Sequence, residues 1–313
     1  MDRSSAPVMV AVDGTEISAG AIKFAIQEAR SRGVGLTVVH VSPSYIALAS
    51  VGSMMPMMGS LPPLMEETSQ RLLAKMCAEI ELAAPDLTIR SILRTGPVSG
   101  SILDATGDAQ VLVVGQETRT GLDRWAAGAT AMKVAAHAEC PVVAVPALWC
   151  PVPARHRLVV GVRSVAAAPD LLAQAFEMAA ARKDTLVVLH AWRLPDPYFD
   201  AIEARTHMDE WIEEGQRLLD EVLAEPRAAF PDVTVEARVV HREPARALVE
   251  AARDADMLVL SRRTHEHLQL TRLGSTARAV LRHATVPVSV LPAHARQVAA
   301  GDQELDRSGH MVR

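Results

Sequence analysis

Short apolar runs alternate with amphipathic segments along this chain, and that order predicts a parallel sheet covered by helices. Residues 8–12 are all apolar and are followed by Asp13-Gly14, which is typical of a buried strand that ends in a turn. Residues 18–32 repeat small and apolar side chains at helical spacing, and Gly33 follows as a helix stop. The chain is therefore predicted to begin with a strand and a helix.

The same pattern continues through both halves of the chain. In the first half it predicts strands over residues 36–41, 88–93, 111–115 and 141–146, and helices over residues 64–84, 98–106 and 128–138. In the second half it predicts strands over residues 158–162, 185–191, 233–240, 257–260 and 286–291, and helices over residues 169–182, 208–229, 244–253 and 274–284. Most of these strands are apolar on both faces, as expected of a parallel sheet buried between two helical layers.

Histidine-containing stretches recur at a nearly constant distance, which indicates a duplicated domain. His40 and His190 each lie near the end of an apolar run, at an offset of 190 − 40 = 150 residues. His137 and His283 each begin a His-Ala stretch that leads to Pro-Val, at an offset of 283 − 137 = 146 residues. Two such similar offsets favour a tandem pair of domains over a short-period solenoid.

The domain boundaries follow from this repeat. We predict a first domain over residues 1–148, a linker over residues 149–156 that holds two prolines, and a second domain over residues 157–292. Residues 293–313 are polar and contain glycines, so a disordered tail is predicted.

Residues 42–63 are rich in methionine, proline and glycine, a composition that disfavours a regular element. We expect a mobile lid or flap there. Its methionines either pack over a pocket, which we favour, or form a flexible surface for a partner. They are Met54, Met55, Met57 and Met58.

Composition excludes several classes of function. The net charge is −5 and aromatic residues are 3%, so neither a basic field for nucleic acid or membrane nor a base-stacking platform is expected. No apolar run approaches the ~20 residues of a membrane span, and no signal peptide is recognised, so a cytoplasmic protein is expected. Cys77, Cys140 and Cys150 lack metal-ligand spacing, and no metal site is predicted.

The candidate binding groups lie where predicted strands end. An open parallel sheet binds ligands outside the carboxyl ends of its strands, where Asp13, Val41 and the loop after Gly115 are expected. A carboxylate there can accept a hydrogen bond from the exocyclic amine of adenine. Gly115 and Gly128 allow close backbone approach, and the helix near Gly128 offers unpaired N–H groups that suit phosphate. Glycines after a strand are also common as simple turns.

Catalytic groups are not apparent in this sequence. His40 and His190 end buried strands, and we expect local hydrogen bonds to satisfy each ring in preference to a role as general base. Neither a nucleophile elbow nor a lysine-containing phosphate loop occurs. No catalytic residue is therefore predicted.

Both halves resemble the universal stress protein family in its tandem form. The resemblance rests on Val-Ala-Val-Asp-Gly-Thr at residues 10–15, on the strand ending His40-Val41, and on Val-Val-Gly at residues 113–115. Residues 137–145 are its most specific stretch. The resemblance implies a five-stranded parallel sheet in each half, of the adenine-nucleotide alpha-hydrolase-like fold, and often ATP binding. We predict two doubly wound α/β domains with strand order 3-2-1-4-5.

The family's nucleotide motif is Gly, two residues, Gly, nine residues, then Gly followed by Ser or Thr. Carried over to the first half, the resemblance implies nucleotide contacts by Val12, Asp13, Val41, Gly115, Thr118, Gly128, Ala129 and Thr130. Thr118 replaces the middle glycine, and a β-branched residue tolerates positive φ poorly, so the phosphate loop is either reshaped or no longer closes. Ala129 replaces the hydroxyl residue, which removes a bond worth about 1.5–3 kcal/mol, although Thr130 follows.

The second half departs further from the motif. Arg163 stands where Asp13 stands in the first half, Ser261 and Thr264 replace the first two glycines, and Gly274-Ser275 keeps the final pair. Arginine only donates hydrogen bonds, so ordinary adenine recognition is not expected there. The basic residues of this loop either hold an anion or form a solvated surface; they are Arg262, Arg263, His265, His267 and Arg272.

Two functions are predicted from these observations. The first is a stress-responsive regulatory protein that binds ATP, with or without Mg²⁺, mainly in the first domain and without efficient turnover; slow hydrolysis stays open. The second is a nucleotide-free dimeric scaffold for an unidentified protein partner. An enzyme of the wider adenine-nucleotide alpha-hydrolase type is a weaker alternative, because no catalytic constellation is visible.

The strands over residues 141–145 and 287–291 are predicted to lie at sheet edges. An edge strand presents unpaired backbone groups that seek a partner. We therefore expect either the two halves or two chains to pair through these strands around a twofold axis.

Overall fold

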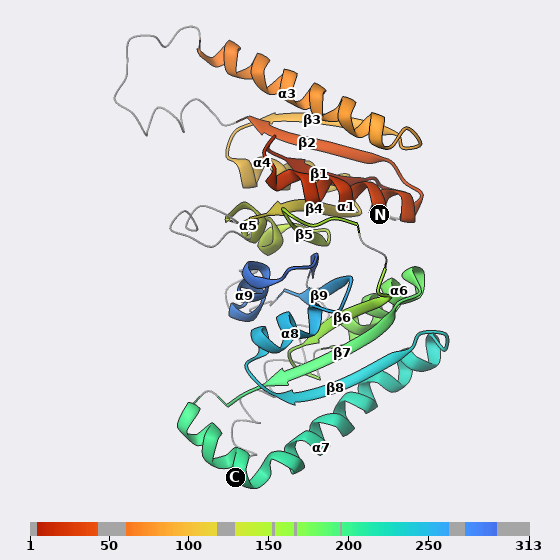
Figure 1. Cartoon of the computed structure of the whole chain (residues 1–313), viewed down its shortest axis with the longest axis vertical. Coiled ribbons are helices and arrows are strands. Elements are labelled where there is room, and N and C mark those ends of the chain that lie inside the picture. Colours follow the sequence, from red (N-terminus) through yellow and green to blue (C-terminus); the bar gives the residue numbers. More distant parts are fainter. Residues whose placement is uncertain are drawn as a thin grey trace. The chain divides into compact units, whose positions relative to one another are not determined.

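The structure is a computed structural model that describes residues 5–42, 61–117, 129–151, 154–165, 168–194, 196–262 and 273–292 (Figure 1). The chain divides into two compact units, Met1–Val152 and Pro153–Arg313, and each is described by itself. This division falls inside residues 149–156, the segment predicted as the linker. The methionines of the predicted lid and the predicted tail lie outside the described residues.

Five parallel strands form the sheet of the first unit. They are β1 (Val8–Val12), β2 (Leu36–Ser42), β3 (Ile89–Thr95), β4 (Val111–Gln116) and β5 (Val142–Pro146). Their order is β3-β2-β1-β4-β5, which confirms the predicted order 3-2-1-4-5. β1 is the central strand, and its residues Val8 and Val10 are fully buried.

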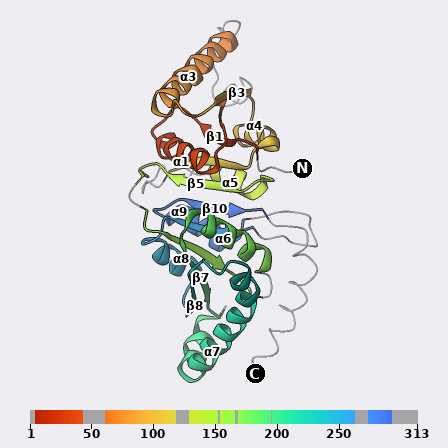
Figure 2. The ribbon, with the colours of Figure 1, turned by 90° about the vertical axis from the view of Figure 1, so that its right-hand side faces the viewer.

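Helices cover both faces of this sheet. They are α1 (Ile17–Arg32), α3 (Leu61–Ala83), α4 (Val98–Ala105), the short 3-10 helix η1 (Thr106–Asp108) and α5 (Ala129–His137). Right-handed crossovers place α1 and α3 on one face and α4 and α5 on the other, two layers that Figure 2 separates. Because α3 begins at Leu61, the predicted irregular segment over residues 42–63 was wrong at its end, where two prolines occupy the first turn of the helix.

The second unit repeats this architecture. Its strands are β6 (Arg157–Val162), β7 (Thr185–Trp192), β8 (Val235–His241), β9 (Met257–Ser261) and β10 (Val288–Leu291). Its helices are α6 (Pro169–Arg182), α7 (Pro197–Ala229), α8 (Pro244–Ala252) and α9 (Ser275–His283). The order β8-β7-β6-β9-β10 again matches 3-2-1-4-5 counted within the unit.

Apolar strands buried between helical layers supply the core of each unit. Leu36 and Leu112 in the first unit and Leu158 and Phe176 in the second are at most 1% exposed. Full burial of one such side chain stabilises the fold by about 1.5–3 kcal/mol. Across the described ranges, no helix combines the length and the apolar character that crossing a membrane requires.

The start of α7 lies well before residue 208, where the sequence analysis placed it. The Oδ1 atom of Asp196 accepts hydrogen bonds from the backbone N–H groups of Tyr198 at 2.8 Å and Phe199 at 3.2 Å. Asp196 is therefore the N-cap. The proline that follows it has no backbone N–H, so it leaves no donor without a partner in the first turn. The predicted start was wrong because apolar spacing alone does not report this cap.

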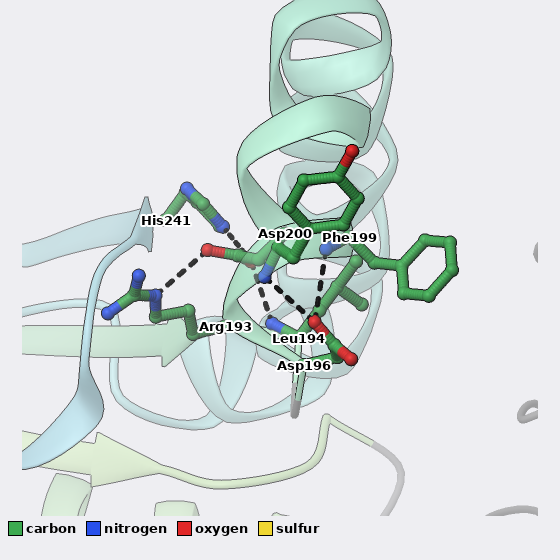
Figure 3. A network of polar contacts seen from close by, with 7 residues as sticks. Arg193, Leu194, Asp196, Phe199, Asp200 and His241 are labelled. Atoms are coloured by element: carbon green, nitrogen blue, oxygen red, sulfur yellow. Dashed lines mark hydrogen bonds and ion pairs between the residues drawn. The ribbon is translucent and has the colours of Figure 1, made fainter.

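A buried carboxylate joins the first turn of α7 to the sheet of the second unit (Figure 3). Asp200 is 2% exposed. Its Oδ1 accepts hydrogen bonds from the Leu194 backbone N–H at 2.9 Å and from Nε2 of His241 at 2.7 Å, and its Oδ2 accepts one from Nε of Arg193 at 2.8 Å. Burial raises the pKa of Asp200, but these hydrogen bonds outweigh it and lower the pKa to about 2.

Substitution of Asp200 by asparagine should lower the free energy of unfolding by about 1.5–3 kcal/mol, because charge-assisted hydrogen bonds are lost. The folded pKa lies below the unfolded value of ~3.9, so the carboxylate stabilises the fold above ~pH 4 and this stabilisation disappears as the pH falls through about 2. Urea denaturation of both proteins at neutral and acidic pH should show the difference shrinking in acid. Asp209→Asn, an exposed change on the same helix, should shift stability by less than ~0.5 kcal/mol; equal losses in the two variants would contradict this role.

Candidate functional site

The candidate site lies at the carboxyl ends of β1 and β4, where the chain switches from one side of β1 to the other. β1 pairs with β4 in a register that sets Ala11 opposite Val114. This register brings Asp13, which follows β1, and Gly115, in β4, to the same edge of the sheet. Val41, near the end of β2, lies at that edge as well.

Asp13 is exposed, and the turn leading into α1 holds its carboxylate. Its Oδ1 accepts hydrogen bonds from the hydroxyl groups of Ser18 and Thr15, each at 2.7 Å, and from the Thr15 backbone N–H at 2.9 Å. Burial raises the pKa of Asp13, but these hydrogen bonds outweigh it and leave the pKa below its ordinary value. At neutral pH Asp13 is therefore an anion, and the hydrogen bonds from Ser18 and Thr15 all reach its Oδ1.

The valines predicted beside the ligand lie mostly in the core. Val12 is 5% exposed and Val41 is 7% exposed. Only a small part of either residue is thus accessible. At the carboxyl ends of the strands these two valines therefore present mainly backbone groups.

The histidine at the end of β2 bonds to this backbone. Nδ1 of His40 lies 2.9 Å from the carbonyl oxygen of Val12, and Nδ1 of His190 lies 3.0 Å from the carbonyl oxygen of Val162 in the second unit. Nδ1 of each ring is therefore satisfied by a local hydrogen bond, as the sequence analysis expected.

Gly115 lies against the first turn of α1. A Cβ atom at this position would approach the carbonyl oxygen of Ile17 to 2.4 Å, which is closer than real Cβ contacts allow. The packing of α1 on the sheet thus requires glycine here. The sequence analysis considered phosphate binding or a simple turn for this residue and did not foresee the packing requirement.

Only part of the predicted phosphate loop is described. Thr118 and Gly128 lie outside the described residues. Ala129 and Thr130 begin α5, where Ala129 is exposed and Thr130 is half-buried. The first turn of α5 therefore offers backbone N–H groups and one hydroxyl group at the predicted position of a phosphate.

The second unit presents different groups at the matching edge. Arg163 follows β6 and is exposed, and Ser261 ends β9 where the first unit has glycine. Gly274 is the N-cap of α9 and Ser275 begins that helix, so the last pair of the motif lies at a helix start, as in the first unit. The basic residues of the loop after Arg262 lie outside the described residues.

Sequence reasoning missed Ser18, which accepts a hydrogen bond from the backbone N–H of Asp13 at 3.0 Å and donates one to its carboxylate. The signal was available as a serine in the first turn of a predicted helix, which commonly bonds to the backbone before the helix. The matching residue of the second unit, 18 + 150 = 168, is Ala168, which has no hydroxyl group.

Comparison with known proteins identifies the family. Residues 5–146 and residues 154–292 each match the universal stress protein family. The chain belongs to the universal stress protein family. Each unit carries one copy of the family's domain, so the chain is a tandem universal stress protein, as the sequence resemblance implied.

Relatives of similar length occur in mycobacteria. A universal stress protein of Mycolicibacterium smegmatis is 28% identical over 288 residues, which cover 91% of this chain and 96% of the relative. One of Mycobacterium tuberculosis is 29% identical over 294 residues, which cover 90% and 96% of the two chains. The crystal structure of a universal stress protein from Archaeoglobus fulgidus is 17% identical, with a TM-score of 0.65 over 91% of this chain and 98% of that one, and supports the same fold.

Gly115→Ala should lower the free energy of unfolding by about 1–3 kcal/mol, because the new Cβ can be relieved only by moving α1 away from the sheet. Denaturant unfolding measures this loss. Gly100→Ala in α4 is the matched control, since a Cβ there meets nothing within 4 Å, and it should be neutral or stabilising by up to about 1 kcal/mol. A loss no larger in Gly115→Ala than in the control would contradict the close contact.

Proposed function

We propose that the first unit binds an adenine nucleotide, ATP in particular, as a regulatory ligand. The observation that carries this proposal is the position of Asp13, an exposed anion directly after the central strand at the topological switch point. Its Oδ1 is occupied by the turn, and its Oδ2 remains to accept a hydrogen bond from the exocyclic amine of adenine. Guanine and hypoxanthine carry a carbonyl oxygen at that position, which an anionic acceptor repels.

The remaining contacts follow from the neighbouring strand ends. The purine would lie against the exposed rim of Val41, with the backbone of Val12 beside it. The phosphate groups would extend towards Gly115 and the first turn of α5, where N–H groups and the positive end of the helix dipole favour negative charge. Gly128 and Thr118 precede that turn in sequence, and Thr130 offers the hydroxyl group that Ala129 lacks.

Magnesium would enter this site with the nucleotide. Within the part of the chain that the structure describes, no group of three histidine, cysteine, aspartate or glutamate side chains is arranged to hold a metal ion. Phosphate oxygens and water would therefore supply most of the ligands of Mg²⁺, as is usual for this ion. We propose a binding role without efficient turnover, since no side chain is assigned as a general base for hydrolysis.

The second unit is proposed as a degenerate site. Arg163 supplies donors where Asp13 supplies an acceptor, which disfavours the adenine amine. Ser275 keeps a hydroxyl group at the start of α9. Any nucleotide in this unit would be held through its phosphates and with little preference for the base.

Asp13→Ala should weaken ATP binding about 10- to 100-fold, because one hydrogen bond between the amine and a charged acceptor is lost. Isothermal titration calorimetry with ATP on wild type and variant measures the change. Asp108→Ala removes an exposed carboxylate before the amino end of β4, at the opposite edge of the sheet, and should leave the affinity unchanged. Equal affinity in wild type and Asp13→Ala would overturn the assignment of the site.

The nucleotide-free scaffold is the alternative that this experiment separates from the proposal. Thr118, Ala129 and Arg163 favour it, because each removes a group that the family's nucleotide motif supplies. The ultraviolet spectrum of the purified protein, with mass analysis of released ligand, decides whether a nucleotide is retained. A spectrum without nucleotide and no heat on addition of ATP would support the scaffold.

We also propose that two copies of the chain pair through the edge strand β5, one of the two pairings that the sequence analysis left open. Leu112 donates its N–H to the carbonyl of Pro141 across the β4–β5 ladder, and the parallel pattern then directs the N–H of Ala144 away from β4. Ala144→Pro removes that donor and should reduce assembly, measured as a smaller mass by light scattering. An unchanged mass together with unchanged stability would count against edge pairing.

A further inference from the structure

The peptide unit between Val12 and Asp13 is held at both of its polar ends by side chains. Nδ1 of His40 lies 2.9 Å from the Val12 carbonyl oxygen, and the Asp13 N–H donates to the hydroxyl oxygen of Ser18 at 3.0 Å. A carbonyl oxygen only accepts hydrogen bonds, so Nδ1 of His40 must carry the proton. This peptide unit leads directly to the carboxylate that the proposed function assigns to adenine.

His40 and Ser18 bind this peptide unit at the point where strand β1 ends. The pairing of β1 with β4 stops at Ala11, and its pairing with β2 stops at Val12. Beyond these pairs the chain turns into α1, and Gly14 adopts a left-handed φ of 79°. The parallel register directs the Val12 carbonyl towards the N–H of Val41 in the β2 ladder, and a carbonyl oxygen can accept two hydrogen bonds. The imidazole of His40, which is 7% exposed, supplies the second bond from within the core.

The second unit contains half of this arrangement. His190 bonds to the Val162 carbonyl across the same sequence separation of 28 residues. Ala168 stands in the place of Ser18, and Arg163 in the place of Asp13. The histidine bond is thus shared by both units, whereas Ala168 has no hydroxyl group to bond as Ser18 does. The second unit therefore provides a matched histidine that faces no adenine acceptor.

We propose that His40 is a positioning residue for adenine recognition: its Nδ1–H, together with Ser18, fixes the Val12–Asp13 peptide and so sets the direction of the Asp13 carboxylate. His40 itself does not touch the ligand. This inference rests on the proposed function, because it concerns the same carboxylate. Without the bond from His40, the strand end can rotate, which weakens the bonds of the Asp13 carboxylate to the turn and changes its direction relative to the base.

Two substitutions of the same histidine separate positioning from bulk stability. The amide nitrogen of asparagine lies as far along the side chain as Nδ1 of histidine, so His40→Asn retains the donor. The amide of glutamine lies one bond further, so His40→Gln fills the space but misplaces the donor. We expect the ATP affinity of His40→Asn to stay within about threefold of wild type. The ATP affinity of His40→Gln should fall about tenfold, which corresponds to the loss of one hydrogen bond. His190→Gln, the same change in the second unit, should leave the ATP affinity unchanged.

The base specificity is the readout that a purely structural role would not move. Inosine triphosphate has a carbonyl oxygen in place of the adenine amine. If His40 sets the direction of the Asp13 carboxylate, His40→Gln should weaken the binding of ATP much more than the binding of inosine triphosphate. The ratio of the ATP affinity to the inosine triphosphate affinity should then fall about tenfold. A loss of the same factor for both nucleotides would show that His40 only supports the fold and would overturn the positioning role.

A measurement without nucleotide keeps this inference separate from the proposed function. Titration of the Asp13 carboxyl carbon by nuclear magnetic resonance should give a pKa below the ordinary aspartate value in wild type, and His40→Gln should raise it towards that value. Failure of wild type to bind ATP or inosine triphosphate would refute the nucleotide site. An unchanged Asp13 titration in His40→Gln would refute the control of the carboxylate by His40, whichever nucleotide is bound.

Discussion

The candidate site depends on the parallel pairing of β1 with β2 on one side and with β4 on the other. Parallel strands bring their carboxyl ends to one edge, and this central strand is apolar on both faces, so polar chemistry is confined to the residues after its last pair. Asp13 is the first such residue. Its charge is tolerated because it lies outside the ladder, and it is held because the turn and Ser18 supply three hydrogen bonds to one oxygen.

The two units share the same strand order and differ in the residues near the carboxyl ends of their strands. Both have five strands in the same order, and both place a histidine where it bonds to the last carbonyl of the first strand. The differences are Arg163, Ala168 and Ser261 in the second unit, which stand at the positions of an aspartate, a serine and a glycine in the first. Arg163 is exposed and follows the ladder, so it can change without cost to the core, whereas Ser261 pairs with Leu291 at the end of β9 and Ala168 is 1% exposed. Gly115 shows the opposite case, since packing and binding would both require the same residue.

The sheet order and nearly all elements were predictable from the sequence, because buried parallel strands are short and apolar while the helices between them have a different period. The start of α7 was not, since it is set by the Asp196 cap and not by apolar spacing. At the site, the position of Asp13 followed from the strand that precedes it. The bond from Ser18, the partner of His40 and the contact between Gly115 and Ile17 all depend on how α1 packs on the sheet, and a linear pattern does not contain that distance.

The departures of the two units from the family's motif are complementary, and this bears on what each can recognise. The first unit keeps Asp13, the proposed acceptor for the base, but has Ala129 where the motif places a hydroxyl residue; the second keeps Ser275 but has Arg163 at the position of Asp13. Phosphate contacts add affinity that every nucleotide shares, whereas a directed acceptor changes the difference between two bases. A site that retains the acceptor but makes weaker phosphate contacts therefore loses affinity for every nucleotide, while it keeps its preference between bases. On this argument the first unit would select its base at modest affinity, and its selectivity would depend on how rigidly the end of β1 is held.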